Sequence, residues 1–180
     1  SRHDVVFLAG HFSAVSALAA DYSTGMITTD LTEPSVDLTN AIVFSAGCHS
    51  GYNIVNQHNI PFVTFEPDWP QAFAQKGATL IAGTGYQYGD TDFIEYSERL
   101  YLEFSRQLRT DAEVEVPVGK ALFRAKRAYL AGTLKMEPLH EKSLLEATLF
   151  GLPMLKGNMG GSRLSLGSGA SAVGGTAGLR

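Results

Sequence analysis

Residues 41–51 of the chain read Ala41-Ile42-Val43-Phe44-Ser45-Ala46-Gly47-Cys48-His49-Ser50-Gly51. The apolar first half is typical of a strand covered on both faces, and the Gly/Ser-rich second half is typical of a turn. Cys48 stands where this strand ends, and it is the only cysteine of the 180 residues. It therefore has no internal disulfide partner, and a multi-cysteine metal site is excluded.

Two more apolar runs resemble this stretch. Residues 5–9 lead into Gly10-His11, and residues 78–84 lead into a glycine-punctuated loop that ends at Asp92. Helices are expected between and after these strands, over residues 69–76, 92–109, 117–130 and 137–148. Strands separated by helices predict an α/β fold with a mainly parallel sheet, whose functional site lies at the carboxyl ends of the strands.

The remaining segments have weaker patterns. Residues 13–20 are read as a short helix or a surface loop, and residues 21–40 as an excursion with a short ribbon at Met26–Thr29. Residues 60–66 contain Pro61 and are expected to form a loop or an edge segment. We predict one domain over residues 1–156 and a flexible Gly/Ser-rich tail or linker over residues 157–180.

Composition narrows the classes of partner. The chain has 18 acidic and 14 basic residues, a net charge of −4 and no Lys/Arg cluster, which argues against direct binding of nucleic acid or an anionic membrane. No apolar stretch approaches the roughly 20 residues of a membrane span, and no signal peptide is visible. We expect neither a metal nor another cofactor. The compartment stays open, with the cytoplasm slightly favoured over secretion.

Cys48 and His11 together have the equipment of a nucleophile and its base. A thiolate attacks a carbonyl, and a neighbouring imidazole accepts the thiol proton and later protonates the leaving amine. The oxyanion needs N–H donors, for which the candidates are the backbones of Gly10, Phe12, Gly47 and Cys48. The alternative is that Cys48 is a buried structural residue and His11 a polar loop residue.

The loop after the third strand supplies candidates for substrate binding. Tyr86 and Tyr88 can wall a pocket, and Asp90 and Asp92 can form a negative floor for a basic side chain. The alternative is that Asp92 caps the helix after it and Asp90 belongs to a turn. Gly83-Thr84-Gly85 lacks the lysine and the spacing of a P-loop, which argues against nucleotide binding.

Five short stretches, in order along the chain, carry a resemblance to a known family. They are Phe7–His11, Ile42–Gly51, Phe73–Thr84, Val118–Lys126 and Leu149–Leu155. Together they resemble the caspase-like cysteine peptidases of clan CD, most closely the gingipain-type branch and the related CHAT domains. The resemblance covers roughly residues 4–156.

The resemblance implies a caspase-like three-layer sandwich in which His11 is the general base and acid and Cys48 the nucleophile. Three features depart from the family pattern: Phe12 replaces a glycine after the histidine, Leu152 replaces an aspartate, and the strands that usually precede the histidine strand are absent. A companion chain or a missing N-terminal segment with a regulatory domain is therefore an expected partner.

Three functional hypotheses follow. The favoured one is a cysteine endopeptidase that hydrolyses protein or peptide substrates, with a basic residue expected at the cleavage site, as part of a larger regulated protein. The alternative is a catalytically inactive caspase-like scaffold that binds partners, which Phe12 supports. A flavodoxin-like ligand binder is the third reading.

Overall fold

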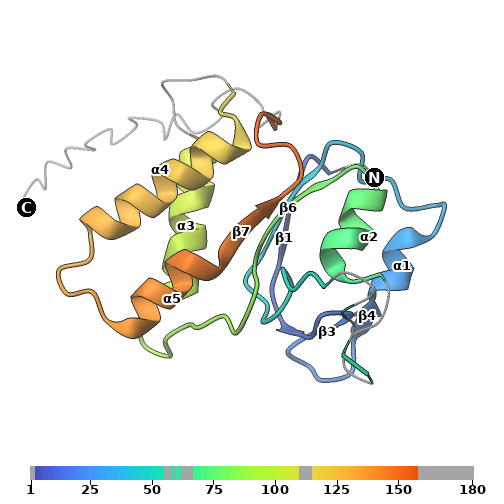
Figure 1. Ribbon diagram of the computed structural model, residues 1–180, viewed down its shortest axis with the longest axis horizontal. Coiled ribbons are helices and arrows are strands. Elements are labelled where there is room, and N and C mark those ends of the chain that lie inside the picture. The colour runs from blue at the N-terminus through green and yellow to red at the C-terminus, as the bar shows by residue number, and fades with distance from the viewer. Residues whose placement is uncertain (1–2, 55–57, 59, 62–66, 110–114, 158–180) are drawn as a thin grey trace, which may run out of the picture.

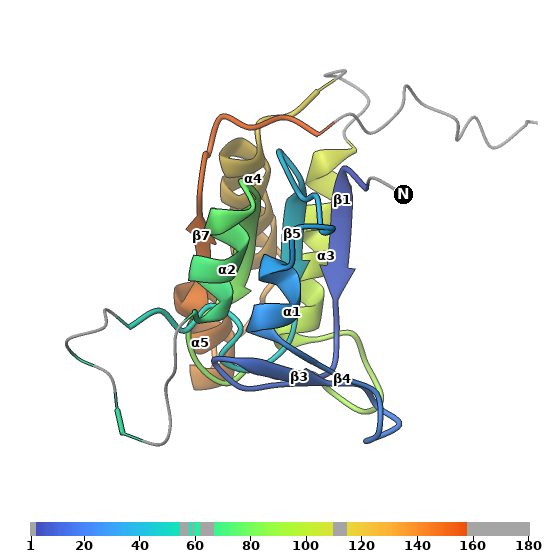
Figure 2. The same cartoon turned by 90° about the vertical axis from the view of Figure 1, so that its right-hand side faces the viewer.

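The computed structural model of the chain describes residues 3–54, 58, 60–61, 67–109 and 115–157. Its centre is a four-stranded sheet in the order β1-β5-β6-β7 (Figures 1 and 2). β1 (Val5–Leu8), β5 (Ile42–Ser45) and β6 (Thr79–Gly83) are parallel, and β7 (Ala147–Phe150) is antiparallel to β6. The predicted α/β class with a mainly parallel sheet is confirmed.

Helices cover both faces of the sheet. α3 (Tyr96–Leu108), α4 (Val118–Ala131) and α5 (Pro138–Glu146) lie on one side, and α1 (Thr28–Thr32) and α2 (Trp69–Gln75) on the other (Figure 1). The result is three layers, as the resemblance to a caspase-like sandwich implied. β1 is the outer strand of the described sheet, and the expectation of a companion segment stays a prediction.

The alternation of side chains along β5 explains why the sheet is buried on both faces. Ile42 and Phe44 pack with Leu100 and Phe104 of α3, in a cluster that α4 completes. Val43, between them, points the other way and packs against Trp69 and its neighbours on α2. All four residues of β5 are buried, which matches the apolar run over its first three residues.

A second, three-stranded antiparallel sheet lies across the end of β1 (Figure 2). It contains β2 (His11–Phe12), β3 (Ser16–Leu18) and β4 (Gly25–Ile27). The prediction of a helix or loop over residues 13–20 is therefore wrong, because β3 pairs with both neighbours. The ribbon expected at Met26–Thr29 ends earlier, since α1 begins at Thr28.

α3 begins four residues later than the predicted start at residue 92. The Asp90 carboxylate accepts hydrogen bonds from the N–H groups of Asp92 and Phe93 at 2.8 and 3.1 Å, which folds this segment as a turn. Glu95 is the N-cap residue, so the interpretation of Asp92 as a helix cap is wrong. Phe93, expected on the apolar helix face, precedes the helix and is 73% exposed.

The third predicted helix, over residues 137–148, is shorter in the structure. α5 ends at Glu146, and residues 147–150 pair with β6 instead, with Ala147 opposite Gly83 and Phe150 opposite Leu80. Local helix propensity does not reveal this strand, because its stability comes from a partner about 70 residues earlier in the chain.

Other boundaries agree closely with the sequence. Asp68 caps α2 by accepting a hydrogen bond from Gln71 N–H, and Gly77 follows the helix with a φ of +68°. Pro117 is the N-cap of α4. Most of residues 60–66 and the tail from residue 158 onward lie outside the described residues. Within the described ranges, every helix is too short or too polar to cross a lipid bilayer.

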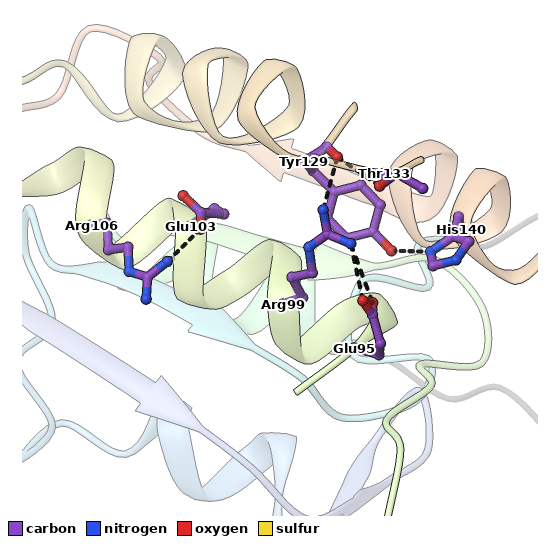
Figure 3. Close-up of polar contacts among 7 residues, drawn as sticks. All are labelled: Glu95, Arg99, Glu103, Arg106, Tyr129, Thr133 and His140. Atoms are coloured by element: carbon purple, nitrogen blue, oxygen red, sulfur yellow. Dashed lines mark hydrogen bonds and ion pairs between the residues drawn. The ribbon is translucent and has the colours of Figure 1, made fainter. Parts of the chain in front are cut away.

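A polar network joins the three helices on one side of the sheet (Figure 3). Arg99 donates to both Glu95 carboxylate oxygens and to the Tyr129 carbonyl, and its guanidinium lies 4.4 Å from the centre of the Tyr129 ring. The Tyr129 hydroxyl lies 2.7 Å from His140 Nδ1. Thr133 Oγ1 donates a second bond to the Tyr129 carbonyl. The Tyr129 pKa is raised to about 12, mainly by burial and in addition by the charge of Glu95.

Candidate catalytic site at the carboxyl ends of β1 and β5

The register of β1 and β5 relates the two predicted catalytic residues to each other. The last pair of these parallel strands is Leu8 and Ser45. His11 and Cys48 each stand three residues beyond that pair in the sequence. Both strands end at the same edge of the sheet, so the chain delivers a histidine and a cysteine to adjacent strand ends.

The turn after β5 is held by a dense set of hydrogen bonds. Ser50 Oγ donates to the Gly47 carbonyl at 2.7 Å, and Gly47 N–H donates to Ser45 Oγ at 3.1 Å. His49 N–H donates to the carbonyl of Gly85, which follows β6. Gly51 N–H donates to the carbonyl of Gly83, the last residue of β6. His49 has a φ of +55°, which completes the tight turn. The backbone that carries Cys48 is therefore held in place by hydrogen bonds on both sides of the residue.

The Cys48 thiol is half-buried and faces the loop after β6. Its Sγ donates to the backbone carbonyl of Gln87 at 3.7 Å, a weak thiol hydrogen bond. In this arrangement the hydrogen-bond partner of the thiol is a backbone carbonyl and not an imidazole.

His11 lies on the small second sheet and is exposed. Its ring stacks on Tyr22, with centroids 4.9 Å apart and planes inclined by 25°. Among the described residues, no hydrogen bond joins His11 to Cys48. The hairpin that carries His11 is fixed to α2, because the Trp69 indole N–H donates to the Ser13 carbonyl at 2.8 Å.

Phe12 brings the two strand ends into contact. A Cβ added at Gly47 would lie 2.1 Å from Phe12 Cδ2, so the phenyl ring lies directly against the Gly47 backbone. The same ring packs on Trp69, at 5.4 Å between centroids. Only a glycine fits at position 47, and the space beside it is filled by an aromatic ring.

The four predicted oxyanion donors differ in their surroundings. Gly47 N–H is engaged by Ser45 Oγ, whereas Cys48 N–H has no acceptor in the described part of the chain. Gly10 has a φ of +152°, and a Cβ there would lie 2.6 Å from the Leu18 carbonyl oxygen. Phe12 forms part of β2, opposite Ala17.

The two predicted substrate-binding tyrosines surround a lysine that sequence reasoning missed. Lys142 Nζ donates to the Tyr88 hydroxyl at 3.1 Å and lies 5.6 Å from the Tyr86 ring centre. The Lys142 pKa is raised, and the hydrogen bond to Tyr88 is the main cause. The edge contact of Tyr86 with His49, at 4.5 Å between centroids, links this group to the residue after the nucleophile.

Asp90 and Asp92 are exposed and lie in the turn before α3. The Asp90 carboxylate is engaged by two backbone N–H groups, as in the turn interpretation. Among the described residues, no group of three or more His, Cys, Asp and Glu side chains is placed to hold a metal ion.

Three side chains near the site bury polar atoms that have no hydrogen-bond partner among the described residues. They are both amide atoms of Gln87, the Tyr101 hydroxyl and Glu146 Oε2. Gln87 lies over Gly83, where a Cβ would be 1.1 Å from its Nε2, and Glu146 lies over Gly85 in the same way. The two glycines were visible in the sequence, but the side chains that fill the space beside them were not.

An apolar groove of about 450 Å³ opens beside the same strand ends. Phe7 and Phe44 line it from the sheet, and Ile94, Tyr101 and Leu102 line it from the start and flank of α3. Another hollow, of about 490 Å³, lies between residues 34–39 and the end of α2. That hollow is at the amino end of β5, where parallel sheets do not place active sites.

Comparison with known proteins gives one structural likeness. No protein-family model and no curated protein matches the chain. The fold is similar to a solved structure described as "Structure of Protease", with a TM-score of 0.48 and 13% sequence identity. The likeness covers 87% of this chain and 36% of the other, so the chain spans about a third of that protein's length. The functional assignment rests on the chain's own residues.

Proposed function

We propose that the chain carries the catalytic centre of a cysteine endopeptidase, with Cys48 as nucleophile and His11 as base and acid. The observation that carries the proposal is the strand register: the two residues follow the paired ends of neighbouring parallel strands at the same offset. The contact between Phe12 and Gly47 supports it, because it joins the segments on which the two residues lie.

The proposed chemistry is acyl transfer. His11 accepts the thiol proton, and the sulfur attacks the carbonyl carbon of the peptide bond. Cys48 N–H, together with a backbone donor near Gly10, stabilises the oxyanion. The intermediate expels the amine, which His11 protonates, and leaves a thioester. Water then hydrolyses the thioester, releasing the acid and restoring the thiol.

Both side chains change partners before this reaction. The thiol must leave the Gln87 carbonyl, and the His11 ring must turn from Tyr22 towards the sulfur. Gly85 and Gly89 lie in the loop that carries Gln87, and Tyr22 is 69% exposed, so both adjustments involve segments outside the central sheet.

The test uses the full chain and an irreversible peptidyl acyloxymethyl ketone, which alkylates an activated active-site cysteine. We expect one equivalent of label on Cys48, at a rate at least tenfold above that of a free thiol peptide, and a large loss of rate in His11→Ala. Cleavage of protein substrates is expected to disappear in Cys48→Ala. Peptidase activity that survives in Cys48→Ala would refute the assignment.

A second candidate is the inactive scaffold, which two observations favour. Phe12, at the position where the pattern of the caspase-like family has a glycine, fills the space beside Gly47, and the thiol is bound to a carbonyl instead of an imidazole. This candidate predicts that the label reacts with Cys48 no faster than with the free thiol peptide, and that Phe12→Gly raises the rate.

A further inference from the structure

We propose that the groove between β1, β5 and α3 binds a bulky apolar side chain of the peptide substrate. The inference deepens the proposed function and rests on it, because the occupant belongs to that enzyme's substrate. The expectation of a basic residue at the cleavage site rested on Asp90 and Asp92. The groove is a different surface, and it would select an apolar side chain instead.

The groove lies beside the candidate catalytic site. Two of its lining residues are Ala9 and Ala46, the first residues beyond the ends of β1 and β5. His11 follows Ala9 by two residues, and Cys48 follows Ala46 by two residues. A peptide whose carbonyl approaches Cys48 therefore has the mouth of this groove within reach of its side chains.

The walls of the groove present apolar surface to water. Phe7 is 53% exposed and Ile94 is 60% exposed, although Phe7 belongs to a strand of the central sheet. The Phe7 and Phe44 rings lie 4.9 Å apart and form one continuous aromatic wall. Exposed apolar residues gathered in a concave site mark a place where an apolar group is bound.

Tyr101 adds its ring to the lining of the groove. Its side chain lines the groove and is 2% exposed, and its hydroxyl has no hydrogen-bond partner in the described part of the chain. The Tyr101 pKa is raised, mainly by burial and in addition by the charge of Glu146, so the hydroxyl remains neutral. The hydroxyl atom itself is buried, so Tyr101 offers its ring to an apolar occupant of the groove.

Eight of the nine described residues that line the groove are uncharged, which suits an apolar occupant. Glu98 is the only charged residue among the described residues that line the groove, and its carboxylate lies against Gly89, where a Cβ would be 2.7 Å away. Glu146, near Tyr101, already has a cation, since Lys142 Nζ lies 3.4 Å from its Oε1. The Asp90 carboxylate is held by two N–H groups.

The experiment measures binding separately from cleavage. The full chain with Cys48→Ser, which prevents turnover, is mixed with acetyl-Gly-Gly-Xaa-Gly-amide peptides that carry a single side chain. The reporter peptide has 4-fluorophenylalanine at Xaa and is followed by fluorine NMR, and leucine, arginine and aspartate peptides compete with it. Ile94→Lys places a charge in the groove from an exposed position, and Leu134→Lys, at a fully exposed residue outside the groove, is the matched control.

We expect the fluorinated peptide to bind and the leucine peptide to displace it, with the arginine and aspartate peptides at least tenfold weaker. Ile94→Lys should weaken binding at least tenfold, and Leu134→Lys should leave it unchanged. Preference for arginine, no binding of any peptide, or binding insensitive to Ile94→Lys overturns the inference. So does a dimer of this chain that Ile94→Lys dissociates, because the groove is then an interface between copies.

The two proposals fail in different ways. Groove-dependent binding without Cys48-dependent cleavage refutes the peptidase and keeps the pocket. Cleavage that depends on Cys48 but is indifferent to Ile94→Lys refutes the pocket and keeps the peptidase.

Discussion

Two polar clusters of the molecule are built in opposite ways. At the outer ends of α3, α4 and α5, the side chains of Glu95, Arg99, Tyr129 and His140 all have partners within one network (Figure 3). In the other cluster, the side chains of Gln87, Tyr101 and Glu146 bury polar atoms that have no partner among the described residues. Buried polar groups in folded proteins are nearly always hydrogen-bonded, and exceptions gather at functional sites. The first cluster therefore serves stability, and we assign the second to function.

The largest effect that separates the clusters is expected at Arg99. Arg99→Met keeps the aliphatic stem but removes three hydrogen bonds and leaves the Glu95 carboxylate without its partner. We expect a loss of about 2–3 kcal/mol in the free energy of unfolding, measured by urea denaturation. Arg106→Met is the matched control: its partner is Glu103, its side chain is 61% exposed, and about 0.5 kcal/mol is expected. Equal effects would mean that the network adds nothing.

Alkaline pH should weaken the first cluster through Tyr129. Its folded-state pKa of about 12 lies above the value near 10 of an unfolded tyrosine, so the folded state favours the neutral phenol. This contribution is fully present below pH 10 and is lost as the pH rises through 12. Over that range wild type should lose about 2 kcal/mol relative to Tyr129→Phe, so its advantage at neutral pH disappears and the variant becomes the more stable protein. A constant difference would contradict the raised pKa.

Removing one hydroxyl from each cluster should give opposite signs. Tyr129→Phe leaves His140 Nδ1 without its 2.7 Å partner, and a loss of about 1–1.5 kcal/mol is expected. Tyr101→Phe removes a buried hydroxyl that bonds to nothing among the described residues, so stability should stay constant or rise by about 0.5 kcal/mol. Thermal unfolding of the two variants measures both changes. A loss in Tyr101→Phe comparable to that in Tyr129→Phe would show that the Tyr101 hydroxyl is satisfied.

Local sequence patterns predicted the parts of the fold that depend on burial and helix ends. The runs at residues 5–9, 41–46 and 78–84 became three parallel strands, and Asp68 and Gly77 marked the ends of α2. β3 and β7 were missed, because each is defined by a strand that it pairs with, which short-range patterns do not contain.

The candidate site shows the same division. The positions of His11 and Cys48 at strand ends followed from apolar runs that each finish in a glycine. Their present partners, Tyr22 and the Gln87 carbonyl, come from loops whose conformation depends on tertiary contacts. Lys142 lies 54 residues from Tyr88 in the chain, so no spacing rule points to their hydrogen bond.

The smallest expected effect concerns the loop over the thiol. Gln87→Leu replaces the buried, unpartnered amide with an apolar side chain of similar size, which should stabilise the loop against Gly83 by about 1 kcal/mol. Because the Gln87 carbonyl then holds the thiol more of the time, iodoacetamide should label Cys48 about fivefold more slowly. Gln75→Leu, at an exposed position on α2, should change neither quantity. Faster labelling in Gln87→Leu would mean that the amide holds the loop in place and that the second cluster is structural like the first.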